Sequence, residues 1–212
     1  MLMTTRTIGW LGAATLALAA FAASAQTAKA PDAFIKEVST DVLEAVKADK
    51  TIRSGDINKV IALVDQKVFP YVNFQRMTAS AVGRYWKQAT PEQQKRLQDE
   101  FKLLLVRTYS GALSQVSAEQ TVELKPMRAS PTDAEVVVRT EIRGKGDPIQ
   151  LDYRLEKAGD SWKIYDVNVL GVWLVENYRN SFAQEIGANG IDGLIAKMAE
   201  RNKSAAAAGA KS

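Results

Sequence analysis

The middle of the chain changes its hydrophobic period from 3.6 residues to two, and this change constrains the fold more than any other feature. Apolar and polar residues alternate in "AEVVVRTEIR" from Ala134 and in "IQLDYRLEK" from Ile149. This alternation predicts strands with one dry and one wet face, as in an antiparallel sheet. Two flanking segments complete a meander of about four strands: "TVELKPM" and "WKIYDVNV". The alternation slips inside the last segment, which indicates a β-bulge or a strand buried on both faces.

Helical periodicity covers the chain on both sides of these strands. The clearest helix start is Thr90-Pro91-Glu92-Gln93. Thr90 is a good N-cap, Pro91 suits the first helical position, and Gln93 sits where a capping box needs it. The helix behind it carries one apolar face to near Ser114. The other helical stripes span residues 34–46, 57–68, 174–186 and 191–198, with a turn at 187–190 before the last.

The order of helices, strands and helices predicts an α+β fold. We expect a curved antiparallel β-sheet of about four strands with helices packed on its concave face. Such a sheet and its helices enclose a cone-shaped space, which is either filled by side chains or holds a ligand. The large apolar residues suit both outcomes, and for any one of them a place in the core is the better reading. The sequence does not separate a filled core from a lined cavity.

The two ends of the chain are predicted to differ from its body. Residues 1–25 have a positive start, an apolar run and the small-x-small triplet Ala23-Ser24-Ala25, which predicts a cleaved secretory signal. A retained anchor is the rival reading, but the apolar run is short for spanning a membrane. Residues 26–203 then form one domain of a soluble, exported protein. The Ala-rich end, residues 204–212, has nothing to bury, so we expect it to be disordered.

Composition excludes several classes of chemistry. The chain has no Cys and no His, which removes Ser-His-Asp and Cys-His catalysis and every zinc site built on His or Cys. No acidic calcium-type loop is present, so we expect no metal. The net charge is +4 with both signs mixed along the chain, and without a basic block nucleic-acid binding has little support.

The remaining acidic residues offer one weak catalytic alternative. Asp152 and Glu156 alternate with apolar neighbours, so we expect them on the solvent side. Asp166 stands beside a long uncharged run, and with Tyr165 or Tyr153 it could serve an isomerase built on a cone-shaped fold. Neighbours in a strand point to opposite faces, however, so Asp166 and Tyr165 should not meet one substrate.

Two long segments resemble the MlaC family, also called the toluene-tolerance auxiliary-component family. They are "FPYVNFQRMTASAVGRYWKQATPEQQKRLQDEFKLLLVRTYSGAL" and "YDVNVLGVWLVENYRNSFAQEIGANGIDGLIAKM", and the resemblance covers residues 31–202. The motifs that carry it are Phe74-x-x-Met77, Gly83-Arg84-Tyr85-Trp86, Thr90-Pro91-Glu92-Gln93, Tyr178-Arg179-x-x-Phe182 and Gly190-Ile191-Asp192-Gly193-Leu194.

This resemblance implies a nuclear transport factor 2-like fold elaborated with helices, and a function without catalysis. It implies a periplasmic phospholipid-binding protein of Gram-negative bacteria that carries phospholipid as cargo and needs no cofactor. The carrier would act as a monomer between an outer-membrane lipoprotein-porin complex and an inner-membrane ABC transporter complex, maintaining outer-membrane lipid asymmetry. Trp173 departs from the small Ser of many relatives, so we expect its indole to narrow the pocket or form part of its floor.

On this reading, the apolar faces of the predicted elements supply the residues around the acyl chains. The candidates are Tyr71, Phe74, Trp86, Phe101, Leu105, Tyr109, Val138, Ile142, Leu151, Tyr153, Val167, Val169, Trp173, Tyr178 and Phe182. Arg84 and Arg179 are candidates for a headgroup phosphate or a partner, and surface or structural ion pairs suit them equally. Two alternatives stay open beside the carrier: a periplasmic isomerase-like enzyme on the same fold, and a non-catalytic binding adaptor with a filled core.

Overall fold

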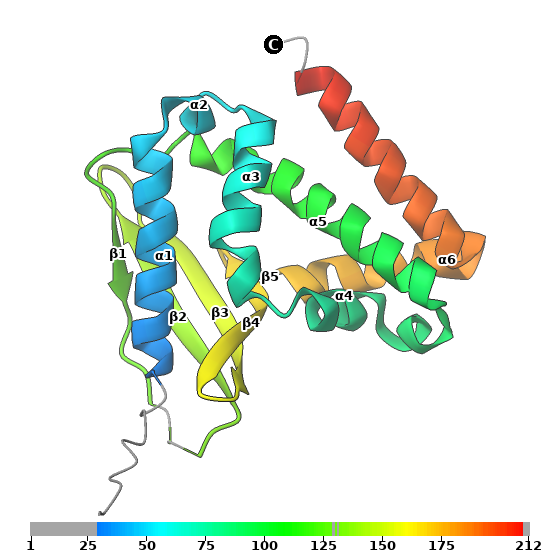
Figure 1. Cartoon of the computed structure of the whole chain (residues 1–212), viewed down its shortest axis with the longest axis horizontal. Coiled ribbons are helices and arrows are strands. Elements are labelled where there is room, and N and C mark those ends of the chain that lie inside the picture. The colour runs from blue at the N-terminus through cyan, green and yellow to red at the C-terminus, as the bar shows by residue number, and fades with distance from the viewer. Residues whose placement is uncertain (1–28, 129, 131, 210–212) are drawn as a thin grey trace, which may run out of the picture.

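The structure is a computed structural model that describes residues 29–128, 130 and 132–209 (Figure 1). The predicted signal peptide lies outside the described residues. The helices before the sheet are α1 (Pro31–Ala48), α2 (Lys50–Arg53), α3 (Ile57–Lys67), η1 (Phe69–Tyr71), α4 (Phe74–Val82), η2 (Gly83–Gln88) and α5 (Pro91–Leu113). The strands β1 (Thr121–Leu124), β2 (Glu135–Arg143), β3 (Ile149–Ala158), β4 (Ser161–Val169) and β5 (Val172–Trp173) follow, and then α6 (Leu174–Gly209). The predicted α+β fold class is confirmed.

The sheet is an antiparallel meander in which each strand pairs with the next along the chain. It has five strands rather than about four, because the two-residue β5 adds to the edge of β4. The predicted irregularity in β4 is a β-bulge. Arg154 faces Asp166 and the next residue, Leu155, faces Ile164, which leaves Tyr165 as the extra residue. The bulge puts the apolar residues of both halves of β4 on one face of the sheet.

Helix α1 covers that apolar face over one half of the sheet (Figure 1). It packs Phe34, Ile35 and Val38 against a floor of buried strand residues. That floor consists of Val138, Leu155, Trp162 and Ile164. Helices α1 and α3 also share a small cluster around Val46 and Val60. The sheet therefore has one half of this face closed by a packed helix.

Beyond the β4 edge, α4, α5 and α6 build a second core, to the right of the sheet in Figure 1. A capping box at Thr90 and Gln93 starts α5, as predicted. Helix α6 changes direction at Gly190, whose φ of 72° and ψ of −179° are not helical. Glycine reaches this backbone region without the steric cost of a Cβ atom. The two helices of the sequence prediction are therefore present as two arms of α6 that meet at Gly190.

The end of α6 differs from the predicted disordered tail over residues 204–209, and residues 210–212 of that tail lie outside the described residues. Helix continues through residues 204–209, where the sequence predicts disorder. Alanine has the highest intrinsic helix propensity, so an Ala-rich segment can extend an existing helix without packing. The side chains of Ala205, Ala206 and Ala207 are exposed accordingly. None of the helices in the described ranges is long and apolar enough to cross a membrane.

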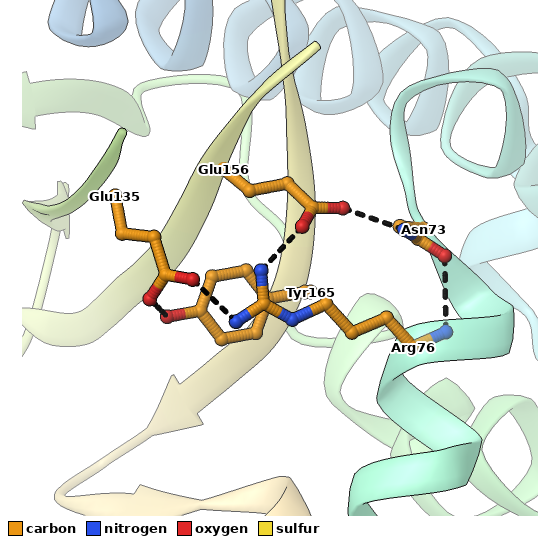
Figure 2. Close-up of polar contacts among 5 residues, drawn as sticks. All are labelled: Asn73, Arg76, Glu135, Glu156 and Tyr165. Atoms are coloured by element: carbon orange, nitrogen blue, oxygen red, sulfur yellow. Dashed lines mark hydrogen bonds and ion pairs between the residues drawn. The ribbon is translucent and has the colours of Figure 1, made fainter. Parts of the chain in front are cut away.

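Arg76 of α4 joins the helical core to the sheet (Figure 2). Its guanidinium lies 3.6 Å from the ring centroid of Tyr165 and forms ion pairs with Glu135, at 2.6 Å, and with Glu156. Asn73 caps α4 through a bond from the Arg76 backbone N–H to its side-chain oxygen, and its amide donates to Glu156. The residue extruded by the bulge thus becomes an anchor for the neighbouring helix.

Candidate functional site

A cavity of about 340 Å³ lies between the uncovered half of the apolar sheet face and helices α3 and α5. Its size falls within the range of small-molecule pockets in proteins. The residues around it are Val64, Val68, Phe69, Val72, Phe74, Met77, Lys102, Leu105, Val106, Tyr109, Ala112, Leu113, Val116, Gln120, Ile142, Ile149, Leu151, Val167, Val169 and Leu174.

Two regular elements supply most of the wall. Leu151 of β3 pairs with Val169 of β4, and both point to the face on which the bulge also places Val167. On the opposite wall, Leu105, Tyr109 and Leu113 recur every four residues along α5 and so share one face of that helix. The cavity walls therefore follow from the period of two residues in the strands and of 3.6 residues in the helix.

The lining is almost entirely apolar. Among the described residues around the cavity, Lys102 is the one charged side chain, and Tyr109 and Gln120 are the other two with polar groups. The Lys102 ammonium lies 3.0 Å from an Asp65 carboxylate oxygen and 4.8 Å from the ring centroid of Phe69. Burial raises the pKa of the Tyr109 phenol above its ordinary value, so this group stays neutral. An apolar ligand suits such a space.

The sequence prediction named seven of the residues that line this cavity. They are Phe74, Leu105, Tyr109, Ile142, Leu151, Val167 and Val169. The other eight candidates lie elsewhere in the structure, in four different places. Their role in binding a ligand stays a prediction that the cavity of this structure does not support.

Four of those eight belong to the helical core. Phe101 is fully buried, with ring centroids 5.1 Å from Tyr178 and 5.2 Å from Phe182, both in edge-to-face contact. Trp86 packs against the same core. Aromatic rings in edge-to-face contact pack directly against one another and leave no room for a ligand between them. Phe74, one of the seven cavity residues, also contacts this core, with its ring centroid 5.8 Å from that of Phe101.

Two more candidates lie under α1. Val138 is fully buried in the core between α1 and the sheet. Tyr153 packs against the same cluster, and its hydroxyl is 3.2 Å from that of Ser39. Both residues are on the apolar face, as the alternation predicts, but a helix rather than a ligand covers them.

Tyr71 and Trp173 are the last two. Tyr71 is exposed and meets Phe34 edge to face at 5.7 Å. Trp173 pairs in register with Asn168 and stacks under the Arg154 guanidinium at 3.9 Å, on the sheet face opposite the cavity. The expectation that its indole narrows the pocket or forms its floor is wrong for this cavity, because the turn after β4 returns β5 with Trp173 on the polar face.

Neither arginine candidate lines the cavity. Arg84 is exposed, and its guanidinium donates to the Tyr85 hydroxyl at 2.9 Å. Arg179 is exposed on α6 and lies beside Gly83. A Cβ atom at Gly83 would be 3.8 Å from the Arg179 Nε. The two arginines therefore belong to the surface of the helical core.

The polar face of the sheet is less exposed to solvent than the sequence predicts. Asp152 is only 5% exposed and accepts a hydrogen bond from Gln150, at 2.9 Å. Glu156 is bound by Arg76 and Asn73. The alternation predicts their face of the sheet correctly, but the predicted solvation is wrong, because Gln150 bonds to Asp152 while Arg76 and Asn73 reach Glu156 from the start of α4.

Asp166 lies on the same polar face and is almost completely buried. It accepts hydrogen bonds from Arg154 at 2.9 Å and from the backbone N–H groups of Val167 and Val175. Burial raises its pKa, while these bonds act in the opposite direction. Tyr153 lies on the apolar face and Tyr165 bonds to Glu135, so neither tyrosine shares a site with Asp166.

Sequence reasoning missed several walls of the cavity. Val64 and Val68 belong to a recognised helical stripe, and Leu113 and Val116 extend the stripe of α5, so periodicity signalled that these four were buried. It did not signal which neighbour they face. Lys102 carried no signal, since one lysine in a surface-facing pattern reads as solvated. Among the described residues no group of three or more acidic side chains could hold a metal ion.

A sequence description of one protein family, "MlaC protein", matches residues 36–200. The chain belongs to the MlaC family. The matched range begins within α1, ends within α6 and includes every residue around the cavity. The MlaC fold therefore contains the candidate site as a whole.

Two curated relatives and one solved structure agree with this MlaC membership. The chain is 27% identical to the toluene tolerance protein ttg2D of Pseudomonas putida, over 89% of this chain and 90% of that protein. It is 26% identical to the intermembrane phospholipid transport system binding protein MlaC of Haemophilus influenzae, over 89% and 91%. A phospholipid-binding protein from Ralstonia solanacearum, solved in complex with a phospholipid, has a TM-score of 0.79 and 48% identity, covering 82% of this chain and 98% of that one.

Proposed function

We propose that the protein is a periplasmic phospholipid carrier that holds acyl chains in the cavity between α3, α5 and the sheet. The observation that carries this proposal is the lining, in which one charged side chain stands among apolar ones. Support comes from the solved relative, which was seen with a phospholipid. The predicted signal peptide supports export to the periplasm.

The energetics of such a carrier require no reacting group. Burying two chains of about 14 methylenes each, at about 0.8 kcal/mol apiece, gives roughly 20 kcal/mol relative to water. A lipid held this way almost never escapes into the periplasm. Relative to a bilayer, which is equally apolar, the net change is close to zero. Exchange at a membrane complex therefore needs a dry cavity and a way in, while loss to water is blocked.

The position of the cavity sets a requirement on that exchange. The cavity of about 340 Å³ lies between α3, α5 and the sheet, so a lipid that enters or leaves it passes between these layers. Flexing between the helices and the sheet is the natural gate.

The name of the Haemophilus relative, an intermembrane phospholipid transport system binding protein, supports a role between two membranes. We propose that the protein works as a monomer, loads and unloads at an outer-membrane lipoprotein-porin complex and an inner-membrane ABC transporter complex, and so maintains outer-membrane lipid asymmetry. Phospholipid is its cargo, and no cofactor or catalysis is part of the proposal.

Native mass spectrometry of the mature protein tests the carrier directly. We expect delipidated protein to gain one or two phospholipids after incubation with phospholipid vesicles. Leu151→Trp, which places an indole on the cavity floor, should lower this occupancy at least about tenfold, because a filled cavity leaves no room for a chain. Val137→Trp is the matched control, since Val137 pairs with Arg154 on the opposite face.

A wild-type mass that stays free of lipid would overturn the carrier and leave the adaptor with a filled core. Equal loss of lipid in both Trp variants would show that the floor of this cavity is not the binding site. A turnover activity that disappears in Asp166→Asn would favour the isomerase-like enzyme instead.

A further inference from the structure

Lys102 stands where the apolar cavity meets a second, polar recess. This outer recess has a volume of about 130 Å³ and is lined by Phe69, Phe74 and Lys102, which also line the cavity, together with Lys95, Gln98 and Asp99. Across the two phenyl rings the surroundings thus change from hydrocarbon to ionic groups. An amphipathic ligand requires the same change along its own length.

The charged groups of the recess are available for exchange. Lys95 and Lys102 are seven residues apart on α5 and share one face of the helix. Lys95 pairs with Asp99 at 2.5 Å with its side chain 76% exposed, and Lys102 pairs with Asp65 at 3.0 Å with its side chain 24% exposed. The exposed Lys95–Asp99 pair contributes little, so a competing anion can take Lys95 at small cost. Lys102 is half-buried, but its partner Asp65 is 47% exposed, so water can solvate that carboxylate when Lys102 turns to another anion.

We propose that this recess binds the phosphodiester group of the bound lipid, with Lys102 as its principal ligand and Lys95 as a second cation. The proposal rests on the carrier function and adds the residue that recognises the cargo. When a lipid enters, the Lys102 ammonium turns from Asp65 to a phosphate oxygen, and the acyl chains continue past Phe69 and Phe74 into the cavity. A charge-assisted hydrogen bond of this kind is stronger than a neutral one.

The other polar end of the cavity suits a headgroup less well. Gln120 is only 8% exposed, and its carbonyl oxygen accepts from the Ser117 backbone N–H. A phosphate there would lose most of its water without a cation in return. At the recess the phosphate keeps solvent and gains a positive charge.

The recess also predicts which headgroups are accepted. The recess is lined by Lys95, Lys102 and Asp99, and the Asp65 carboxylate that pairs with Lys102 balances the second lysine from outside the lining. A zwitterionic phospholipid therefore fits as well as an anionic one, because its phosphate can meet a lysine while its ammonium meets a carboxylate. The shared requirement is the phosphodiester.

Mixed vesicles of dioleoyl phosphatidylcholine and dioleoylglycerol separate the phosphate from the acyl chains. Delipidated protein is incubated with them, and the two bound lipids are quantified by mass spectrometry. We expect the wild type to enrich phosphatidylcholine over the diacylglycerol about tenfold relative to the vesicles, as one charge-assisted hydrogen bond allows. In Lys102→Gln the enrichment should fall toward one because phospholipid uptake drops. Lys67→Gln, which breaks a comparable pair with Asp41 outside both cavities, should match the wild type.

Each result decides one of the two proposals. Loading of both lipids without enrichment in the wild type would overturn the phosphate site and leave the carrier intact. Loading of neither would overturn the carrier itself. An equal drop of both lipids in Lys102→Gln would show that Lys102 shapes the cavity rather than binding phosphate. Inorganic phosphate alone should not raise the melting temperature. A rise that Lys102→Gln abolishes and Lys67→Gln keeps would assign the recess to free phosphate instead.

Discussion

Trp173 has its side chain on the face of the sheet opposite the cavity, where it contributes to packing. Its indole stacks on Arg154, on the polar face of the sheet. We expect Trp173→Ser to lower the free energy of unfolding by about 1–2 kcal/mol, through loss of the cation–π contact and of packing. Lipid occupancy should stay at the wild-type level, because the side chain does not line the cavity.

Urea unfolding and native mass spectrometry measure the two effects of Trp173→Ser. Val172→Ser, in the same short strand but at an exposed side chain, is the control and should change neither. A gain of lipid in Trp173→Ser, with Val172→Ser unchanged, would contradict the placement of Trp173 and restore the indole to the cavity.

Asp166 and Glu135 should give opposite pH dependences of stability. Burial raises the pKa of Asp166, so its contribution is present below about pH 3.9 and is lost as the pH rises through the raised folded value. Hydrogen bonds from Arg76 and Tyr165 lower the pKa of Glu135, so its contribution is present above about pH 4.3 and is lost as the pH falls through the lowered folded value.

Urea unfolding of two isosteric variants between about pH 7 and pH 3 tests this pair. The stability of the wild type relative to Asp166→Asn should increase as the pH falls. Its stability relative to Glu135→Gln should decrease over the acidic part of the range. Slopes of the same sign would show that one of the two environments is assigned wrongly.

At the scale of residues, the sequence predicted burial better than it predicted neighbours. Leu105 and Phe101 lie on the same apolar stripe of α5, yet one faces the cavity and the other fills the aromatic core. Periodicity fixes the face of a helix, whereas the space opposite each residue depends on which element packs there. Lys102 escaped notice for the same reason, because its role depends on Phe69 and Asp65 from another part of the chain.

At the scale of elements, the first turn of α5 contributes to stability through its capping box. Its capping box satisfies the Gln93 backbone N–H with the Thr90 hydroxyl and the Thr90 N–H with the Gln93 side chain. We expect Thr90→Ala to lower the free energy of unfolding by about 1 kcal/mol, as for other N-cap losses. Urea unfolding measures the change.

Thr108→Ala on the same helix is the matched control for Thr90→Ala. Thr108 is exposed, and its hydroxyl bonds only to the Leu104 carbonyl of the preceding turn. Because Ala favours the helix interior, this change should be neutral or slightly stabilising. Equal destabilisation by both changes would argue against a special role for the cap.

The elements themselves were the most predictable level of this structure. Alternation located the long strands and the irregularity in β4, and capping chemistry located the start of α5. The two-residue β5 is too short for any periodic signal, and it forms because the chain turns back against β4. The helical end of α6 was missed because apolar patterning was weighed there and intrinsic propensity was not.

In the whole molecule, the cavity and the aromatic core are separate. Phe101, Tyr178 and Phe182 close their core without a ligand, and the core and the cavity share a wall that includes Phe74 and Met77. We expect the delipidated protein to keep its fold, and lipid-loaded protein to be more stable by more than about 2 kcal/mol, because a ligand that binds only the folded state adds to stability. Urea unfolding of the two forms measures the difference.

Leu151→Trp provides the control for this comparison. With its cavity filled by an indole, the variant should unfold at one midpoint whether or not it has been exposed to vesicles. A delipidated wild type without a cooperative transition would contradict the separation of core and cavity. The family and its lipid-binding fold were evident from motifs, whereas this separation required the positions of helices that are far apart in the sequence.

The extra residue in β4 makes this strand one residue longer than the stretch of β3 with which it pairs, and substitutions leave that difference in length unchanged. Trp162 and Ile164 face α1, Val167 and Val169 face the cavity, and the insertion of Tyr165 lets both pairs use one side of the sheet. Deleting Tyr165 would remove the bulge and restore strict alternation, with Asp166 still opposite Arg154 and with Val167 and Val169 still on the cavity side. The loss of this single codon would therefore keep the inside and outside of the strand, but it would remove the ring that stacks with Arg76 and bonds to Glu135, and with it the anchor between the sheet and α4.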